Sequence, residues 1–175
     1  MKALIVDDMQ NDFIDGALGT PEAEAIVSNV KAKIEEYRKD SNAVIFTRDT
    51  HSDNYMETQE GRKLPVPHCI EGSDGWQIRA ELQQEESLII DKPTFGSYEL
   101  VDSLRELDEE TPLEAIELVG LCTDICVISN AIMVKAAFLE IPVMVDASCC
   151  AGVTPASHDN ALGAMAMCQI EIIGR

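Results

Sequence analysis

Six short apolar runs, separated by segments with helical periodicity, constrain the fold of this chain more than any other feature. The runs cover residues 3–6, 43–47, 88–90, 115–119, 143–145 and 170–173. Most of them are continuously apolar rather than alternating, which is typical of strands that are covered on both faces. Strands that alternate with helices pair in parallel. The sequence therefore predicts a three-layer α/β/α fold with a six-stranded, mostly parallel sheet.

The segments between the runs contain clear helix signals. Thr20 and Thr154 are suited to be N-caps, and each precedes a proline, which favours the first helical position. Residues 49–86 have little periodicity and many polar groups, and a connection of that length is usually functional or disordered. We expect it to be a loop that contributes to a metal and substrate site. The expected helices cover about 21–37, 98–107, 124–139 and the residues after 154.

Length and charge limit the possible functions. The chain has 175 residues, which fits one domain over 1–175, and its formal net charge of -19 argues against nucleic acid or an anionic membrane as a partner. The first apolar stretch ends too early for a secretory signal, and no uncharged run approaches the ~18 residues of a membrane span. We therefore expect a cytoplasmic protein.

The six cysteines lack the spacing of a small disulfide-linked domain, so we expect free thiols, with Cys168 in the core.

Three ionisable residues follow three of the apolar runs. Asp8 follows the first run, Lys92 the third, and Cys126 lies a few residues past the fourth. Because the carboxyl ends of parallel strands share one edge, where open α/β folds bind ligands, we expect these side chains to meet. An acid, a cation and a thiol can form a reactive thiolate and move its proton, which points to covalent hydrolysis. From these residues alone, a buried structural cysteine is the alternative for Cys126.

The position of Cys126 bears on its acidity. It lies where a strand ends and a helix begins, and a helix N-terminus lowers the pKa of a thiol and offers free amides to an oxyanion. Lys92 also favours the thiolate, whereas the negative charge of Asp8 opposes it. We expect the thiol and the carboxylate to share one proton.

Two of the three histidines occur in the long connection after the second run. Asp49 and His51 are two residues apart on an extended segment, so both can bind one ion, and Glu60 and His68 could complete the site. Two imidazoles with two carboxylates suit zinc, iron or manganese. Ordinary loop histidines are the alternative. The third histidine, His158, is expected at a helix cap or on the surface.

Four motifs, in this order along the chain, carry a resemblance to a known family. They are DMQNDF at 8–13, TRDTH at 47–51, Lys92, and TDICV at 123–127. Together they resemble the isochorismatase-like cysteine hydrolases, and within these the nicotinamidase (pyrazinamidase) branch. The resemblance spans the whole chain.

The resemblance implies a role for each residue of the thiol group. Cys126 would be the nucleophile, Asp8 the general base that also protonates the leaving amine, and Lys92 the cation beside both. The backbone amides of Cys122 and Cys126 would form the oxyanion hole, with a cis peptide bond at Leu121–Cys122. The implied reaction deamidates nicotinamide or pyrazinamide to the acid and ammonia through a thioester, a step of NAD salvage.

The resemblance also implies a metal site and an assembly. Asp49, His51, Glu60 and His68 match the metal ligands of this branch, and Glu57 is a less suitable match than Glu60. The ion is expected to be zinc, with iron or manganese as alternatives. Members of the family are commonly homo-oligomers, dimers or larger. An apolar set could form such a contact or could pack on the sheet: Met133, Val134 and Phe138.

Three aromatic residues are candidate walls for a planar substrate: Phe13, Trp76 and Phe95. The alternative is that these rings only pack the surrounding loops. Two other functions stay open. One is a different amidase of the same family, acting on an N-carbamoyl compound, ureidoacrylate or maleamate. The other is a redox or non-catalytic thiol protein that uses Cys122 and Cys126, although their spacing is not C-x-x-C.

Asp7 departs from the family pattern, which has an apolar residue before the catalytic acid. By the alternation of an extended chain, Asp7 should point to the opposite face from Asp8. The sequence does not identify a partner for this carboxylate.

Overall fold

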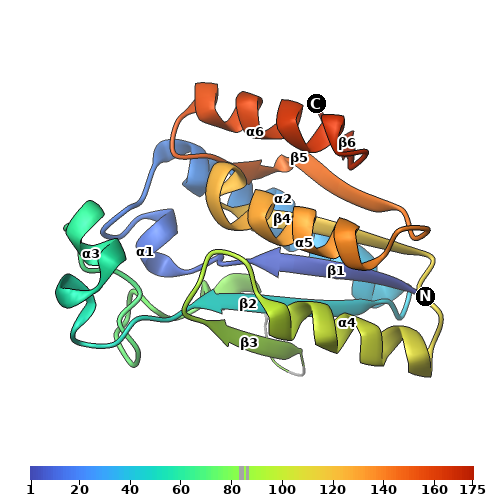
Figure 1. Cartoon of the computed structure of the whole chain (residues 1–175), viewed down its shortest axis with the longest axis horizontal. Helices are drawn as coiled ribbons and strands as arrows, with labels where there is room; N and C mark the ends of the chain where they lie inside the picture. The colour runs from blue at the N-terminus through green and yellow to red at the C-terminus, as the bar shows by residue number, and fades with distance from the viewer. Residues whose placement is uncertain (83–84, 86) are drawn as a thin grey trace.

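The computed structural model describes residues 1–82, 85 and 87–175, and its described strands form one sheet in the order β3-β2-β1-β4-β5-β6 (Figure 1). Every neighbouring pair is parallel, so the predicted α/β fold is confirmed and the sheet is parallel throughout. The strands are β1 (Lys2–Asp7), β2 (Ala43–Asp49), β3 (Leu88–Lys92), β4 (Ala115–Leu121), β5 (Val143–Ala151) and β6 (Glu171–Ile173).

Helices cover both faces of this sheet. Helix α2 lies on one face, and α4, α5 and α6 lie on the other (Figure 1). The long helices are α2 (Pro21–Lys39), α4 (Tyr98–Glu110), α5 (Ile128–Ala137) and α6 (Pro155–Met167). The connections contain α1 (Asn11–Ile14), α3 (Gln59–Lys63), two 3₁₀ turns (Tyr55–Glu57 and Ala80–Leu82) and a π-helical turn, η3 (Thr123–Val127).

The apolar run of β1 fills two separate cores, because successive side chains of a strand point to opposite faces. Ala3 and Ile5 pack in the core under α4, α5 and α6, whereas Leu4 and Val6 pack under α2. All four are fully buried. Burial of each larger side chain stabilises the fold by about 1.5–3 kcal/mol relative to exposure. This two-sided burial explains why the run is continuous.

The helix starts agree with their sequence signals. The Thr20 hydroxyl accepts a hydrogen bond from the amide of Ala23, 3.0 Å away, and Thr154 forms a capping box with Ser157. A cap of this kind contributes about 1 kcal/mol. These caps set where α2 and α6 begin.

Three expectations about the helices need revision. The helix expected over 124–139 is a π-helical turn followed by α5, which ends at Ala137. The expected loop over 49–86 contains α3 and both 3₁₀ turns, and residues 83, 84 and 86 of it lie outside the described residues. The prediction that Cys168 is in the core is wrong, because it caps the end of α6 on the exposed side.

The apolar residues considered for an oligomer contact lie in the protein core or pack against it. Val134 and Phe138 are buried among the side chains between α5 and the sheet, and Met133 packs against them. None of the described helices has the length and apolar character needed to cross a membrane. The oligomeric state, the cytoplasmic location and the single-domain organisation stay predictions.

Candidate active site

The carboxyl edge of the sheet begins with an unusual backbone turn at the end of β1. Asp8 has φ of +44°, in the left-handed region that non-glycine residues seldom adopt. Beside it, Gly120 of β4 pairs with Asp7 and has φ of +120°, and a Cβ there would lie 2.1 Å from the Asp7 carbonyl oxygen. Only glycine fits that position, so β1 and β4 approach each other closely at this edge.

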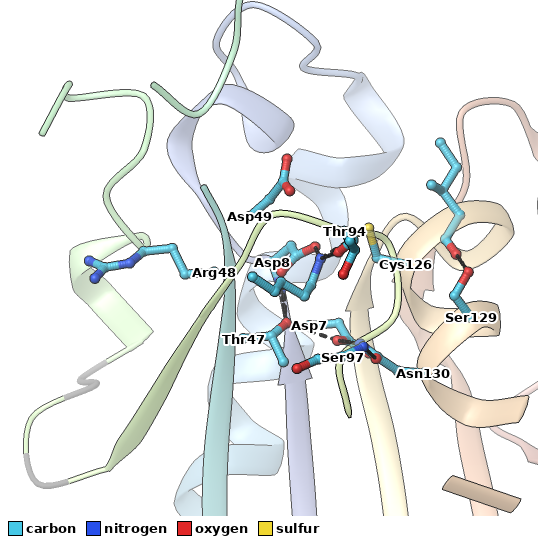
Figure 2. A network of polar contacts seen from close by, with 12 residues as sticks. Asp7, Asp8, Thr47, Arg48, Asp49, Thr94, Ser97, Cys126, Ser129 and Asn130 are labelled. Atoms are coloured by element: carbon cyan, nitrogen blue, oxygen red, sulfur yellow. Dashed lines mark hydrogen bonds and ion pairs between the residues drawn. The ribbon is translucent and has the colours of Figure 1, made fainter. Parts of the chain in front are cut away.

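This turn brings both carboxylates onto one partner. The Thr47 hydroxyl lies 2.9 Å from Oδ1 of Asp7 and 2.7 Å from Oδ1 of Asp8 (Figure 2). The prediction that the two side chains point to opposite faces is therefore wrong. It assumed that the extended strand continues through Asp8, whereas the positive φ ends the alternation there.

Asp8, Lys92 and Cys126 form a compact group that we call the thiol centre. The Lys92 ammonium lies 2.6 Å from Oδ2 of Asp8 and 3.4 Å from Sγ of Cys126, and it also donates to the carbonyl of Thr94. All three residues are buried: Asp8 is 0% exposed, Lys92 is 1% exposed and Cys126 is 4% exposed. Segments far apart in the sequence thus bring an acid and a thiol to the same cation. Figure 2 shows Asp8 and Cys126 on the two sides of this group.

Burial governs the protonation of this centre. It raises the pKa of the Cys126 thiol well above its ordinary value, an effect that Asp8 adds to and Lys92 opposes. Burial also raises the pKa of Asp8, against the attraction of Lys92. For Lys92, burial opposes the charge, but Asp8 and Cys126 keep its pKa above the ordinary value. Burial and Asp8 thus favour the protonated form of the sulfur, and the expected lowering of its pKa by the helix terminus does not prevail.

The turn that carries the thiol is fixed by polar contacts. Its first peptide bond, Leu121–Cys122, is cis, as the resemblance implied. The Cys122 carbonyl accepts hydrogen bonds from the amides of Ile125 and Val127. Nδ1 of His158 lies 2.8 Å from the Thr123 hydroxyl, so this half-buried residue contacts the turn, and the cap of α6 is formed by Thr154 and Ser157 instead.

Asp49, His51 and His68 form a second group, the histidine cluster, at the same edge. One potential ligand atom from each lies within 4.8 Å of the other two. Oε1 of Glu60, on α3, is 3.7 Å from Nε2 of His51 and 3.9 Å from Nε2 of His68. The structure thus brings together all four residues considered for a metal. The ring of Tyr55 packs against both imidazoles.

The donor atoms of the histidine cluster fit a divalent ion. Nδ1 of His68 lies 2.8 Å from the Val66 carbonyl, an arrangement that leaves Nε2 free to bind a metal. Nε2 of His51 is buried and has no hydrogen-bond partner among the described residues. Burial opposes the charge on Asp49, but the two imidazoles hold the pKa of its carboxyl below the usual range. One carboxylate oxygen and two imidazole nitrogens suit zinc, and also iron or manganese.

The three aromatic candidates lie in different surroundings. Phe13 lines a cavity of about 230 Å³, together with Cys122 and Ile125 of the thiol-bearing turn. The Trp76 ring stacks under the guanidinium of Arg48, 3.5 Å away, and Phe95 is 48% exposed. Of the three, Phe13 is thus placed beside the thiol-bearing turn.

Three polar residues that hold the site were not recognised from the sequence as functional. The Gln10 side chain bonds both the amide and the carbonyl of Asp49, and Thr47 and Asn130 bond Asp7. Gln10 and Thr47 lie inside two of the quoted motifs, and this position could have indicated a role in the site. Asn130 could have been noticed only as a polar residue within an apolar helix, which is a weak indication.

The fold and the site define a class: parallel α/β proteins with a buried thiol, acid and cation at the carboxyl edge of the sheet. The chain belongs to the isochorismatase family, because the model of the isochorismatase domain matches residues 2–175. It is 27% identical over 188 residues to the nicotinamidase/pyrazinamidase of Mycobacterium tuberculosis, covering 99% of this chain and 98% of that protein.

Solved structures are similar over nearly the whole chain. The pyrazinamidase of Pyrococcus horikoshii in complex with zinc is 26% identical, with a TM-score of 0.84 over 99% of both chains. The N-carbamoylsarcosine amidase of Thermoplasma acidophilum is 25% identical, with a TM-score of 0.78 over 99% of this chain and 96% of that chain.

Proposed function

We propose that this protein is a metal-assisted cysteine amidohydrolase that deamidates nicotinamide or pyrazinamide to the acid and ammonia. The observation that carries the proposal is the contact of one ammonium, on Lys92, with both the Asp8 carboxylate and the Cys126 sulfur. A base and a nucleophile held by a shared cation serve acyl transfer and have no evident use in a binding protein.

The reaction uses Cys126 as the nucleophile. Asp8 takes the proton from the sulfur as the sulfur bonds to the amide carbon, and the carbonyl electrons move to oxygen, where the amides of Cys122 and Cys126 stabilise the charge. Asp8 then returns the proton to the leaving nitrogen, the carbon–nitrogen bond breaks, and ammonia departs from a thioester. Water attacks the thioester while Asp8 takes its proton and passes it to the sulfur, which releases the acid.

Lys92 stabilises this sequence of charges without changing its own. It stays protonated beside Asp8, and it faces the sulfur when the negative charge moves there. In a site from which water is excluded, such a fixed cation acts strongly.

The histidine cluster would hold one divalent ion, which we expect to be zinc, through Asp49, His51 and His68, with Glu60 beside them. When bound, that ion supplies a Lewis acid that orients the substrate. The cavity of about 230 Å³ beside Cys122 is the proposed place for the rest of the amide, and Phe13 would form one of its walls.

An assay of ammonia release tests the proposal. Nicotinamide and pyrazinamide are compared with N-carbamoylsarcosine, ureidoacrylate and maleamate, and the metal content of the same sample is measured. The N-carbamoyl substrate is included because the similar Thermoplasma acidophilum protein is an amidase of N-carbamoylsarcosine. Release from the two aromatic amides by a metal-containing sample supports the proposal. Ammonia release from only one of the other three compounds would identify that compound as the substrate instead. If no amide releases ammonia, the proposal that the protein is an amidohydrolase is wrong.

The mass of the active species, measured by sedimentation, decides the separate prediction of a homo-oligomer. A monomer would contradict it.

A further inference from the structure

Asp7 is a buried carboxyl group that the proposed reaction does not use. It is 0% exposed, and its Oδ2 atom is buried without a hydrogen-bond partner among the described residues. An ionised carboxylate requires donors on both oxygens, and an unpaired anionic oxygen away from water is costly. This environment disfavours the ionised form.

The orientation of Asn130 restricts what Asp7 can do. Oδ1 of Asn130 lies 2.9 Å from the backbone amide of Ser97, which can only donate a hydrogen bond. The Asn130 amide nitrogen must therefore face Oδ1 of Asp7, 2.6 Å away, and donate to it (Figure 2). Oδ1 of Asp7 accepts this bond whether or not it carries a proton.

The contacts of the Thr47 hydroxyl with the two carboxyl groups require one more proton than the hydroxyl itself has. The Thr47 hydroxyl oxygen lies within 2.9 Å of Oδ1 of Asp7 and 2.7 Å of Oδ1 of Asp8, and it accepts the Asp8 amide at 3.3 Å. A hydroxyl has one proton, so it can donate to only one of the two carboxyl oxygens. The other short oxygen–oxygen contact needs a proton from the carboxyl group itself.

That additional proton belongs on Asp7. Asp8 has the Lys92 ammonium 2.6 Å from its other oxygen, which stabilises its negative charge, whereas Asp7 has no such ion pair among the described residues. Among the described residues, the thiol of Cys150 on β5 is a further titratable group near Asp7, and Lys92 separates Asp8 from the thiol of Cys126. In agreement, the pKa of Asp7 is raised to about 7, mainly by burial and secondly by the charge of Asp8. The charge of Lys92 and the hydrogen bonds with Thr47 and Asn130 lower this pKa but do not outweigh the first two effects.

We propose that Asp7 is a carboxylic acid that keeps its proton in the resting enzyme and positions Asp8 through the Thr47 hydroxyl. Oδ1 of Asp7 donates to Thr47, and Thr47 donates to Oδ1 of Asp8, so that Oδ2 of Asp8 faces Lys92. Asp7 is a positioning residue, since it acts only through Thr47. The proposal rests on the role of Asp8 as the general base proposed above.

Infrared spectroscopy of the full chain tests the protonation state without any substrate. At about pH 6, we expect a carbonyl band of a protonated carboxylic acid that disappears in Asp7→Asn and remains in the control Glu60→Gln. In Thr47→Val, which removes the hydrogen-bond partner, the same band should shift to higher frequency. This second variant covers the case in which Asp7→Asn does not fold. A wild-type protein without a band that depends on Asp7 would overturn the proposal.

The pH dependence of Cys126 alkylation tests the positioning role. In Asp7→Asn, the new carbonyl oxygen must face Asn130, so it accepts the Thr47 proton and Asp8 loses its donor. We expect the acidic limb of the alkylation profile to move to higher pH and kcat/KM for the amide to fall about tenfold. Thr47→Ser, which keeps the hydroxyl, should retain the wild-type profile, whereas Thr47→Val should not.

The outcomes separate this proposal from the proposed function. A lower yield of folded Asp7→Asn with an unchanged pH profile would mean a merely structural role and would overturn the proposal. If the wild-type protein hydrolyses no amide, the proposed function fails, while the infrared band and the alkylation profile still decide the state and effect of Asp7.

Discussion

The thiol centre and the histidine cluster lie at the same edge of the sheet but are constructed differently. Asp8 and Lys92 come from strand ends, and Cys126 comes from the turn directly after β4. In the histidine cluster only Asp49 belongs to a strand, whereas His51 and His68 come from the connection between β2 and β3. The first group is positioned by the hydrogen-bonded sheet, and the second depends on how that connection folds.

The two groups also differ in charge balance. In the thiol centre, the ammonium of Lys92 compensates the carboxylate of Asp8 within the protein. In the histidine cluster, Nε2 of His51 is buried without a hydrogen-bond partner among the described residues, and Oδ2 of Asp49 lies 3.0 Å and 3.6 Å from Nε2 of His51 and of His68. The thiol centre is therefore complete by itself, while the histidine cluster is suited to a cation. This difference predicts that either group can be inactivated without dismantling the other.

The largest effect is expected from Cys126→Ala. Removal of the nucleophile should lower amide hydrolysis by about 10⁴-fold or more, because the remaining groups cannot form the thioester. The metal content should equal that of the wild type, since the sulfur is not part of the histidine cluster. Ammonia release and metal analysis on the same preparation measure both quantities.

Cys168→Ala is the matched control for this variant, because Cys168 is an exposed thiol at the end of α6. It should keep wild-type activity. Substantial hydrolysis by Cys126→Ala would show that the nucleophile is assigned incorrectly.

The next effect is expected from His51→Ala. Loss of one of three clustered ligand atoms should abolish stoichiometric metal binding and lower hydrolysis by about 10²-fold. The rate of Cys126 alkylation should change much less, because Lys92 and Asp8 remain in place. His158→Ala removes a histidine outside the cluster and should keep the metal. Equal loss of metal in both variants would contradict the assigned ligands.

The same contrast explains what the sequence could predict. Each residue of the thiol centre is located by an apolar run, because the run sets where its strand ends and parallel strands end at one edge. Asp49 and Lys92 also lie directly opposite each other in the pairing of β2 with β3. The connection after β2 has no such periodicity, so α3, which carries Glu60, was expected as loop. Residue types indicated the metal site there, but only the fold could supply its distances.

Asp7 marks the limit of reasoning from periodicity. Alternation along β1 correctly divides Ala3, Leu4, Ile5 and Val6 between the two cores. It fails at Asp8 because that residue has a positive φ, which no local pattern of the sequence indicates. The partner of Asp7 on α5, Asn130, is 123 residues away in sequence. Contacts of that range are set by helix packing.

An intermediate effect concerns stability and pH at the thiol centre. The pKa of Asp7 is about 7 in the fold and 3.8 ordinarily, so between these values the folded protein binds a proton that the unfolded chain has lost. The free energy of unfolding should therefore fall as the pH rises through this window. From about pH 5 to about pH 8 the loss is about 3 kcal/mol, and Asp7→Asn should lack it.

Denaturant unfolding at the two pH values measures this dependence. Asp40→Asn, an exposed carboxylate at the end of α2, is the control and should keep the wild-type slope. If Asp7→Asn and the wild type lose the same stability with rising pH, Asp7 is ionised throughout and belongs with the ordinary carboxylates.

The smallest effect is expected at the rim of the histidine cluster. Glu60 lies 3.7 Å or more from both imidazoles, and its side chain is 25% exposed, so water can replace its carboxylate. Glu60→Gln should weaken metal binding only about tenfold, in contrast to the loss expected for His51→Ala. Glu57→Gln, an exposed neighbour in the preceding 3₁₀ turn, should leave the affinity unchanged. Titration with zinc against a chelator separates these cases, and a larger effect of Glu57→Gln would assign the fourth ligand to that turn rather than to α3.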